Sequence, residues 1–232
     1  MDSEQVTTVT VDSYSTLVDI DSQEPVLAEY VDDIEDAASV SQLWRSQYLQ
    51  YSMIANDIDA YRPFWELIGQ GLRYALEAHG HDVPEDVRDD IRRVVYEERL
   101  AVFDDVGDGI RRITDAGYEV YVLSNGTPEM LAHLLAAADL EDVVTDAVSA
   151  DEVETYKPDP GLYRHAADRT DTPIEELLHA SGGTMRDVWG AKHAGMQTAW
   201  VSRPDQHLPT ETLGPAPDVV VEDFHDLADR LD

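Results

Sequence analysis

Cysteine is absent from the 232 residues of this chain. Its absence excludes disulfides, thiolate metal sites and cysteine nucleophiles. Also missing is any run of about 20 apolar residues, the length needed to cross a bilayer. The N-terminus lacks the basic region and the apolar run of a secretory signal peptide. From these absences we expect a cytoplasmic protein that does not bind a membrane.

Positive charge is scarce. Lys and Arg together number 16 against 49 Asp and Glu, a net charge of −33, and the only lysines are Lys157 and Lys192. Such a chain should repel nucleic acid. The acidic residues lie in segments with helical apolar periodicity, which argues against a disordered tail. Because molar salt shortens the screening length to about 3 Å, we expect a halophilic source. The alternative is an acidic protein from an ordinary mesophile.

Apolar periodicity separates one helical block from a region of alternating strands and helices. Residues 6–11, VTTVTV, predict a buried strand. Helical spacing then continues to about residue 100. From residue 105 onward strand patterns alternate with helical ones, which is typical of a parallel sheet with right-handed crossovers. We therefore predict an α/β fold with a core of residues 1–16 and 105–232 and an inserted helical cap of residues 17–104.

Polar groups follow several of the predicted strands. Asp12 comes directly after the first strand, and Ser124 and Asn125 follow the strand YEVYVL. Lys157 and the glycine-rich turn 181–187 lie near the ends of later strands. Each of these is a common turn or cap residue when taken alone. The carboxyl ends of parallel strands border the ligand crevice of such folds, so their coincidence predicts an active site at that edge.

Five segments resemble motifs of the haloacid dehalogenase superfamily and together span nearly the whole chain. The segment VDSYSTLVD is similar to the motif that starts with the nucleophilic aspartate, here Asp12. The tyrosine at position 14 makes this motif resemble that of the (S)-2-haloacid dehalogenase branch, whereas phosphatase branches have a second aspartate at that position. The second, third and fourth motifs resemble YVLSNGTPEML, YKPDPGLY and SGGTMRDVWGAKHAG. Finally, QLWRSQYLQYSM resembles the cap helix that supplies a substrate arginine, here Arg45.

This resemblance implies a Rossmann-like core with a helical cap and a definite reaction. Short (S)-2-haloacids would be hydrolysed to (R)-2-hydroxyacids and halide through an ester on Asp12. The implied catalytic residues are Asp12, Thr16, Ser124, Asn125, Lys157 and Asp187. The implied substrate-binding residues are Tyr14, Arg45, Leu49, Phe64, Ser124, Asn125, Tyr163 and Thr184. The implied partners are the 2-haloacid and halide, together with a second copy of the chain, since relatives are often homodimers.

The chemistry is also reasonable from the residues themselves. A carboxylate can displace halide from a saturated carbon, and water can then hydrolyse the resulting ester. An ammonium such as that of Lys157 favours the ionised nucleophile, and Arg45 offers bidentate pairing to the substrate carboxylate. Phosphoryl transfer would instead need a divalent cation held by carboxylates. Tyr14 and Gly183 stand where phosphatase relatives have acids, so we predict no metal and no cofactor.

Several residues depart from the family pattern. Ser15 stands where the family has glycine, which restricts the backbone beside the nucleophile. Alignment on Asp187 places Gly182, Thr184 and Arg186 at the serine, asparagine and tryptophan positions of the fourth motif. Thr184 retains a hydrogen-bonding group, and Arg186 would make the pocket more cationic. These changes leave two alternatives open: a phosphatase of the same superfamily acting on a small phosphorylated metabolite, and a non-catalytic descendant.

Overall fold

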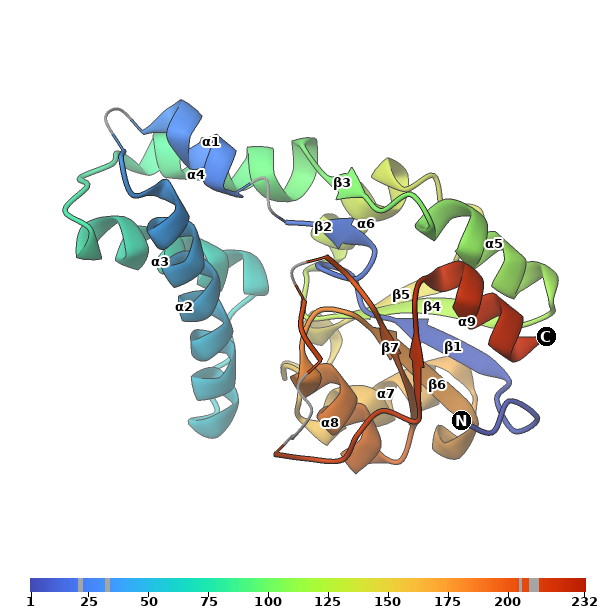
Figure 1. Cartoon of the computed structure of the whole chain (residues 1–232). Coiled ribbons are helices and arrows are strands. Elements are labelled where there is room, and N and C mark those ends of the chain that lie inside the picture. The colour runs from blue at the N-terminus through green and yellow to red at the C-terminus, as the bar shows by residue number, and fades with distance from the viewer. Residues whose placement is uncertain (21–22, 32–33, 205, 209–212) are drawn as a thin grey trace. The chain divides into compact units, whose positions relative to one another are not determined.

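The computed structural model describes residues 1–20, 23–31, 34–204, 206–208 and 213–232. The chain forms two compact units (Figure 1). The core unit comprises Met1–Val18 and Val102–Asp232, and the second unit is Asp19–Ala101. The division expected from sequence lay after residues 16 and 104.

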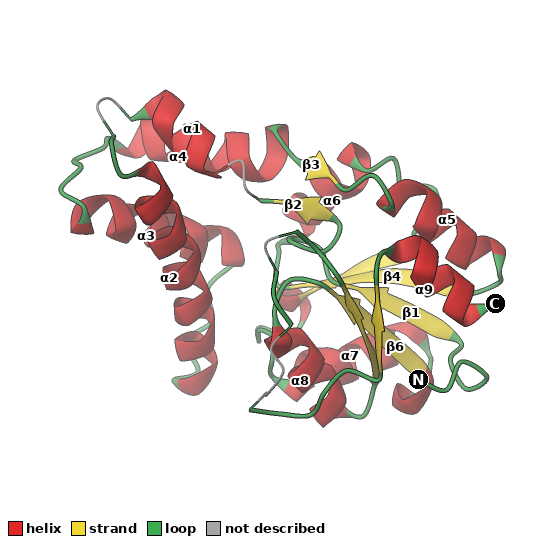
Figure 2. Ribbon diagram, in the orientation of Figure 1, coloured by secondary structure: helices red, strands yellow, loops and turns green. Residues whose placement is uncertain are grey.

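The core unit contains a six-stranded parallel sheet, shown in yellow in Figure 2. Its order is β5-β4-β1-β6-β7-β8, and every pairing within it is parallel. The central strand, TVTV, is buried along its whole length and rich in β-branched residues, which suit a strand covered on both faces. The predicted α/β fold is confirmed. The strands are β1 (Thr8–Val11), β4 (Glu119–Ser124), β5 (Asp146–Ser149), β6 (Leu177–Ser181), β7 (Gln197–Val201) and β8 (Val219–Val221).

Helices cover both faces of this sheet. The pair α5 and α9 pack on each other on one face, and α7 and α8 pack together on the opposite face (Figure 1). Local signals set their ends: Thr127 caps α6 through its side chain, and α8 stops at Gly195, whose φ is 112°. The core helices are α5 (Val106–Asp115), α6 (Pro128–Ala137), α7 (Pro160–Thr170), α8 (Met185–Ala194) and α9 (Phe224–Leu231), with short 3-10 turns at Ala150–Glu152 and Ile174–Glu176.

Strand register brings the carboxyl ends of the central strands together. Val11 is aligned with Val122 on one side and with Ala180 on the other. Asp12 therefore follows β1 at the point where the chain order of the strands reverses, because β1 lies between β4 and β6. Open α/β sheets bind ligands at such a switch point.

The second unit is built from helices around an aromatic core. Trp44 is fully buried, its Nε1 donates to the carbonyl oxygen of Ile68 at 2.8 Å, and its ring meets that of Tyr96 edge-on at 5.9 Å. These contacts join α2 to α3 and to the π-helical turn. The elements are α1 (Gln23–Tyr30), α2 (Ala37–Asp57), α3 (Phe64–Ala78), α4 (Glu85–Arg93) and the π-helical turn Val94–Glu98. Within the described residues, no helix combines the length and apolar character needed to cross a bilayer.

Two short strands were not predicted. The strands β2 (Val18–Asp19) and β3 (Ala101–Val102) pair with each other and lie where the chain passes between the two units. Each has only two residues, which is too short to show the alternation of a strand.

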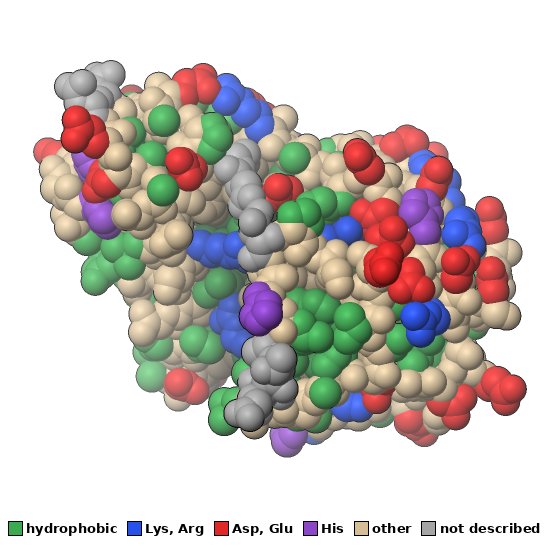
Figure 3. Space-filling view, in the orientation of Figure 1, with side chains coloured by type: hydrophobic (Ala, Val, Ile, Leu, Met, Phe, Trp, Pro, Cys, Tyr) green, Lys and Arg blue, Asp and Glu red, His purple; other side chains and the backbone are tan. Residues whose placement is uncertain are grey.

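Acidic side chains, red in Figure 3, are spread over much of the visible surface among the blue basic ones.

Candidate active site

Asp12 is held at the end of β1 by both carboxylate oxygens. Its Oδ1 accepts from the Lys157 Nζ at 2.9 Å, and its Oδ2 accepts from the Thr16 hydroxyl at 2.7 Å. The backbone N–H of Asp12 donates to Ala180 of β6 at 2.9 Å. The residue is buried, with 9% of its surface exposed. Thr16 is itself fixed by a 2.9 Å bond from the Gly182 N–H.

Lys157 forms a buried ionic centre with two aspartates. Its ammonium lies 2.9 Å from Asp12 and 2.7 Å from Asp187, and the lysine is only 4% exposed. Burial of charges is tolerated where they are paired and hydrogen-bonded. The centre Asp12–Lys157–Asp187 carries a net charge of −1 when all three groups are ionised. The backbone N–H of Lys157 donates to Oδ1 of Asn125 at 2.8 Å, so that amide positions the lysine.

The pKa values of the two aspartates in this centre are shifted in opposite directions. Burial, reinforced by the negative charge of Asp187, raises the pKa of Asp12 even though Lys157 and Thr16 favour its ionised form. Burial also opposes ionisation of Asp187, but the Lys157 ammonium outweighs it and holds the pKa of Asp187 well below the ordinary range. In Lys157, burial is outweighed by the two carboxylates, which raise its pKa. Asp12 is therefore the first of the two aspartates to take up a proton as the pH falls.

The start of α8 orients Asp187. The Thr184 hydroxyl, just before the helix, donates to Asp187 Oδ2 at 3.0 Å. Tyr163 is fully buried, and its hydroxyl donates to the Asp187 carbonyl at 3.2 Å. Thr184 and Tyr163 were both predicted to bind substrate. In the structure their hydroxyls bind Asp187, so their observed contact is with the ionic centre.

A second polar group lies at the end of β4. Ser124 accepts from the Gly126 N–H at 2.9 Å, and its hydroxyl lies 2.6 Å from that of Ser13. Ser13 is 1% exposed and was not singled out in the sequence, although its position beside Asp12 was a usable signal. If Ser13 donates to Ser124, the Ser124 proton remains available for a ligand oxygen. The Asn125 side chain is half-buried and binds Lys157 through its oxygen.

The backbone around Asp12 shows how the departures from the family pattern are accommodated. Ser15 has a φ of 68°, the left-handed conformation that glycine adopts most easily. A side chain at Gly182 would meet the Val201 carbonyl at 2.5 Å, so a serine does not fit there. At Gly183 a Cβ atom would lie 3.3 Å from Asp12 Oδ2. An acid at position 183 would thus stand directly beside the nucleophile, and glycine supplies none.

Tyr14 occupies the position of the second phosphatase acid. It is half-buried, and its hydroxyl points to the Met130 carbonyl of α6 at 3.4 Å. The described residues contain no group of three or more histidine, cysteine, aspartate or glutamate side chains placed to hold a metal ion. The Lys157 ammonium lies between the Asp12 and Asp187 carboxylates and pairs with an oxygen of each.

Three predicted substrate residues belong to the second unit. Arg45 and Leu49 lie on α2, and both are half-buried. Phe64 begins α3 and is 6% exposed, with its ring edge-on to Tyr48 at 5.5 Å. Phe64 therefore contributes to packing inside its own unit. Its role toward halide, like those of Arg45 and Leu49 toward the substrate, stays a prediction.

Arg203 is a further residue that sequence reasoning missed. It is 7% exposed, and its Nε donates to the Thr16 carbonyl at 2.9 Å. Its Nη1 lies 2.8 Å from Asp105 at the start of α5. Arg203 thus braces the loop that carries Thr16. A single arginine after a strand has no pattern that would have revealed this contact.

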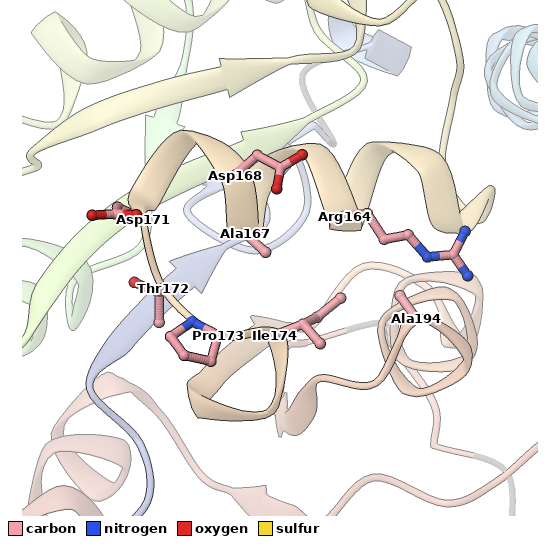
Figure 4. Close-up of a pocket in the computed structure, with 8 residues that line it drawn as sticks. All are labelled: Arg164, Ala167, Asp168, Asp171, Thr172, Pro173, Ile174 and Ala194. Carbon is pink, nitrogen blue, oxygen red and sulfur yellow. The ribbon is translucent and has the colours of Figure 1, made fainter.

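A surface pocket of about 650 Å³ lies elsewhere in the core unit (Figure 4). It forms where α7 ends and the chain turns through Pro173 toward β6. The adjoining Thr172 bonds Thr8 at the first residue of β1, whereas Asp12 follows the last. The pocket is therefore at the opposite end of the sheet from the ionic centre, and none of the predicted site residues lines it.

Comparison with known proteins agrees with this geometry. The family model of haloacid dehalogenase-like hydrolases matches residues 6–195. The chain belongs to this family. Among curated members, (S)-2-haloacid dehalogenase 4A of Burkholderia cepacia is 33% identical over 193 residues, which is 83% of this chain and 81% of the relative. (S)-2-haloacid dehalogenase 1 of Pseudomonas sp. strain CBS-3 is 32% identical over 83% of this chain and 82% of its own.

One similar solved structure contains a covalently bound ligand. The L-2-haloacid dehalogenase of Xanthobacter autotrophicus, with chloropropionic acid covalently bound, superposes with a TM-score of 0.86 at 26% identity. The match covers 97% of each chain. The family resemblance inferred from the motifs is thereby confirmed.

Proposed function

We propose that the chain hydrolyses short (S)-2-haloacids to (R)-2-hydroxyacids and halide. The observation that supports this most strongly is the buried Asp12–Lys157–Asp187 centre, in a family whose Xanthobacter member binds chloropropionic acid covalently. A carboxylate oxygen of Asp12 attacks C2 of the substrate from the side opposite the halogen. The C–O bond forms, the carbon–halogen bond breaks, and the halide leaves with the bonding electrons, so the configuration at C2 inverts.

Water completes the reaction by attacking the ester carbonyl on Asp12. The acyl C–O bond breaks, the hydroxyacid leaves, and one proton is released to solvent for each turnover. Asp187 orients the water as a hydrogen-bond acceptor, and Lys157 stabilises the negative charge that develops on the ester oxygen. Thr16 holds the other oxygen of Asp12 through its hydroxyl. Water, haloacid and products balance without an added oxidant or reductant.

Substrate recognition requires donors for the carboxylate. We assign this role to the Ser124 hydroxyl and the Asn125 amide and, as the resemblance implies, to Arg45. Tyr14, Leu49 and Phe64 are assigned to the apolar and halide contacts, as the resemblance implies. Arginine pairs with carboxylates in a bidentate way, which favours substrates that keep a free carboxylate.

The phosphatase alternative finds less support. Tyr14 and Gly183 replace two of the acids that would hold a divalent cation, and Lys157 already bridges the two that remain. We therefore propose catalysis without a metal.

We also propose a cytoplasm rich in salt as the working environment and a homodimer as the assembly. The net charge of −33 and the presence of only two lysines support the first of these.

Halide release from (S)-2-chloropropionate tests the proposal. The salt should be potassium sulfate, so that released chloride can be measured against a low background. We expect release from the (S) enantiomer, little from the (R) enantiomer, and no loss on addition of EDTA. Asp12→Asn should lower the rate by at least about 1000-fold, because the nucleophile is lost.

The control is Asp142→Asn, which changes an exposed aspartate outside the site. It should release chloride at the wild-type rate. Absence of halide release from all short chloro- and bromo-acids would overturn the dehalogenase proposal and favour the non-catalytic alternative. Chelator-sensitive phosphate release would favour the phosphatase.

A further inference from the structure

His179 is a buried titratable residue that the proposed reaction does not use. It lies in the middle of β6, opposite Thr10 of β1, and is 1% exposed. Its ring meets the Tyr163 ring edge-on at 5.6 Å. Its Nε2 lies 3.7 Å from Asp187 Oδ1 of the ionic centre. A histidine inside the otherwise apolar strand segment LLHA therefore lies beside an aspartate of the ionic centre.

The two ring nitrogens have unequal surroundings. Nδ1 lies 2.9 Å from the Thr10 hydroxyl, within hydrogen-bond distance. Nε2 is buried and has no hydrogen-bond partner in the part of the chain that the structure describes. A neutral imidazole has one N–H donor and one acceptor nitrogen. If Thr10 donates to Nδ1, the proton is on Nε2 and points toward Asp187. The opposite tautomer would place a lone pair against a carboxylate.

The charge state of His179 follows from its neighbours. Asp12 and Asp187 attract a proton to the ring, whereas Lys157 repels one, and Tyr163 is a neutral neighbour. Burial, with help from Lys157, outweighs the two carboxylates and lowers the pKa of His179. The ring is therefore neutral at neutral pH. It can offer Asp187 an N–H dipole without adding a second cation to compete with Lys157.

We propose that His179 is a positioning residue that holds the Asp187 carboxylate in place during ester hydrolysis. The inference rests on the proposed dehalogenase reaction. In the free enzyme Lys157 is shared between two carboxylates, but esterification removes the charge of Asp12 and leaves the ammonium to attract Asp187 alone. Thr184 then restrains one oxygen of Asp187, and the N–H of His179 restrains the other. Halide displacement precedes this step and should not depend on His179.

Two substitutions separate the contacts of the ring. His179→Gln can place an amide nitrogen near the position of Nε2 and keep the donor to Asp187. His179→Asn can keep a partner for Thr10 but is too short to reach Asp187. Both remove the titratable ring, and both leave a polar group in a buried strand. Their unfolding free energies, measured in urea, show whether the pair is matched in stability.

The deciding measurement mixes each enzyme rapidly with (S)-2-chloropropionate and follows both chemical steps. Released chloride reports ester formation, and the intact mass of acid-quenched protein reports the ester that remains. We expect His179→Asn to form ester at the wild-type rate but to hydrolyse it about tenfold more slowly, because the N–H donor that faces the charged Asp187 carboxylate is lost. His179→Gln should hydrolyse the ester within about threefold of wild type.

Equal slowing in both variants, or wild-type hydrolysis in His179→Asn, would overturn the inference. If neither variant folds, nitrogen-15 NMR of the wild-type imidazoles decides the question, because it identifies the protonated nitrogen of His179. An Nε2–H tautomer is expected, and an Nδ1–H tautomer would refute the proposal. Wild-type protein that releases no chloride would instead count against the dehalogenase function itself.

Discussion

Lys157 and Lys192 are the only lysines of the chain, and the core unit gives them contrasting surroundings. Lys157 is 4% exposed and bridges Asp12 and Asp187. Lys192 binds Asp218 at 2.6 Å, with about a quarter of each side chain exposed. Asp218 also accepts from the backbone N–H of Thr198 at 2.8 Å, so this second pair ties α8 to the sheet. Lys157 is shared by two carboxylates, so the centre that contains the nucleophile keeps a net negative charge. Lys192 pairs with one carboxylate, Asp218, and neutralises it.

Removing each ammonium in turn should show the largest difference between the two lysines. Lys157→Met leaves two aspartates buried without a cation and should cost about 3–5 kcal/mol of unfolding free energy. It should also abolish halide release. Lys192→Met removes a partly exposed pair and should cost about 1 kcal/mol or less, with activity retained. Urea unfolding and chloride release, measured at one ionic strength, test both expectations.

The matched substitutions control for loss of the lysine chain itself. Comparable destabilisation by both would mean that the ionic centre is as well solvated as a surface pair. Retained activity in Lys157→Met would remove the lysine from the mechanism.

The contrast between the two lysines was only partly predictable from sequence. Lys157 precedes a proline and matches a family motif, and the end of β1 could be inferred from VTTVTV, so Asp12 and Lys157 were expected to meet. Ser13 and His179 were missed because their roles depend on parallel-strand register. That register sets Thr10 beside His179 and the end of β1 beside β4. Periodicity within one segment carries no information about such partners.

Acid titration should separate activity from stability. The pKa of Asp12 is raised above the ordinary aspartate value of 3.8, so the nucleophile is protonated, and activity lost, at a higher pH than for an ordinary aspartate. The pKa of Asp218 is lowered: its burial is outweighed chiefly by the Lys192 hydrogen bond. Its stabilising effect is present above the unfolded-state pKa and is lost only as the pH falls through the lower folded value.

The expected result is an inactive but folded protein in a window of acid pH. Protonation of Asp12 also relieves the burial of its charge, so this step alone should not unfold the core. The pH dependence of single-turnover chloride release, compared with circular dichroism of the same samples, measures the two events. Coincident loss of activity and fold would contradict the assignment of the acid limb to Asp12.

The smallest expected change in stability concerns Ser15, the residue in the left-handed conformation beside the nucleophile. Its left-handed backbone costs a residue with a Cβ atom about 1–2 kcal/mol, and glycine would lose about 0.5–1 kcal/mol through its more flexible unfolded state. The backbone contribution of Ser15→Gly is therefore a gain of about 0.5 kcal/mol in unfolding free energy, from which the contribution of the contacts that the serine makes is subtracted. Urea unfolding of the variant would reveal the gain, and a clear loss of stability would show that the serine side chain makes a compensating contact.

The central claim is that Asp12 itself carries the substrate as an ester. A single turnover with enzyme in excess, in water enriched in oxygen-18, tests it directly. If water attacks the ester carbonyl, the isotope enters the Asp12 carboxylate and the hydroxyacid product remains unlabelled. We expect label in the peptide that contains Asp12. Label in the hydroxyacid, with none in that peptide, would show that water displaces halide directly and would contradict the account.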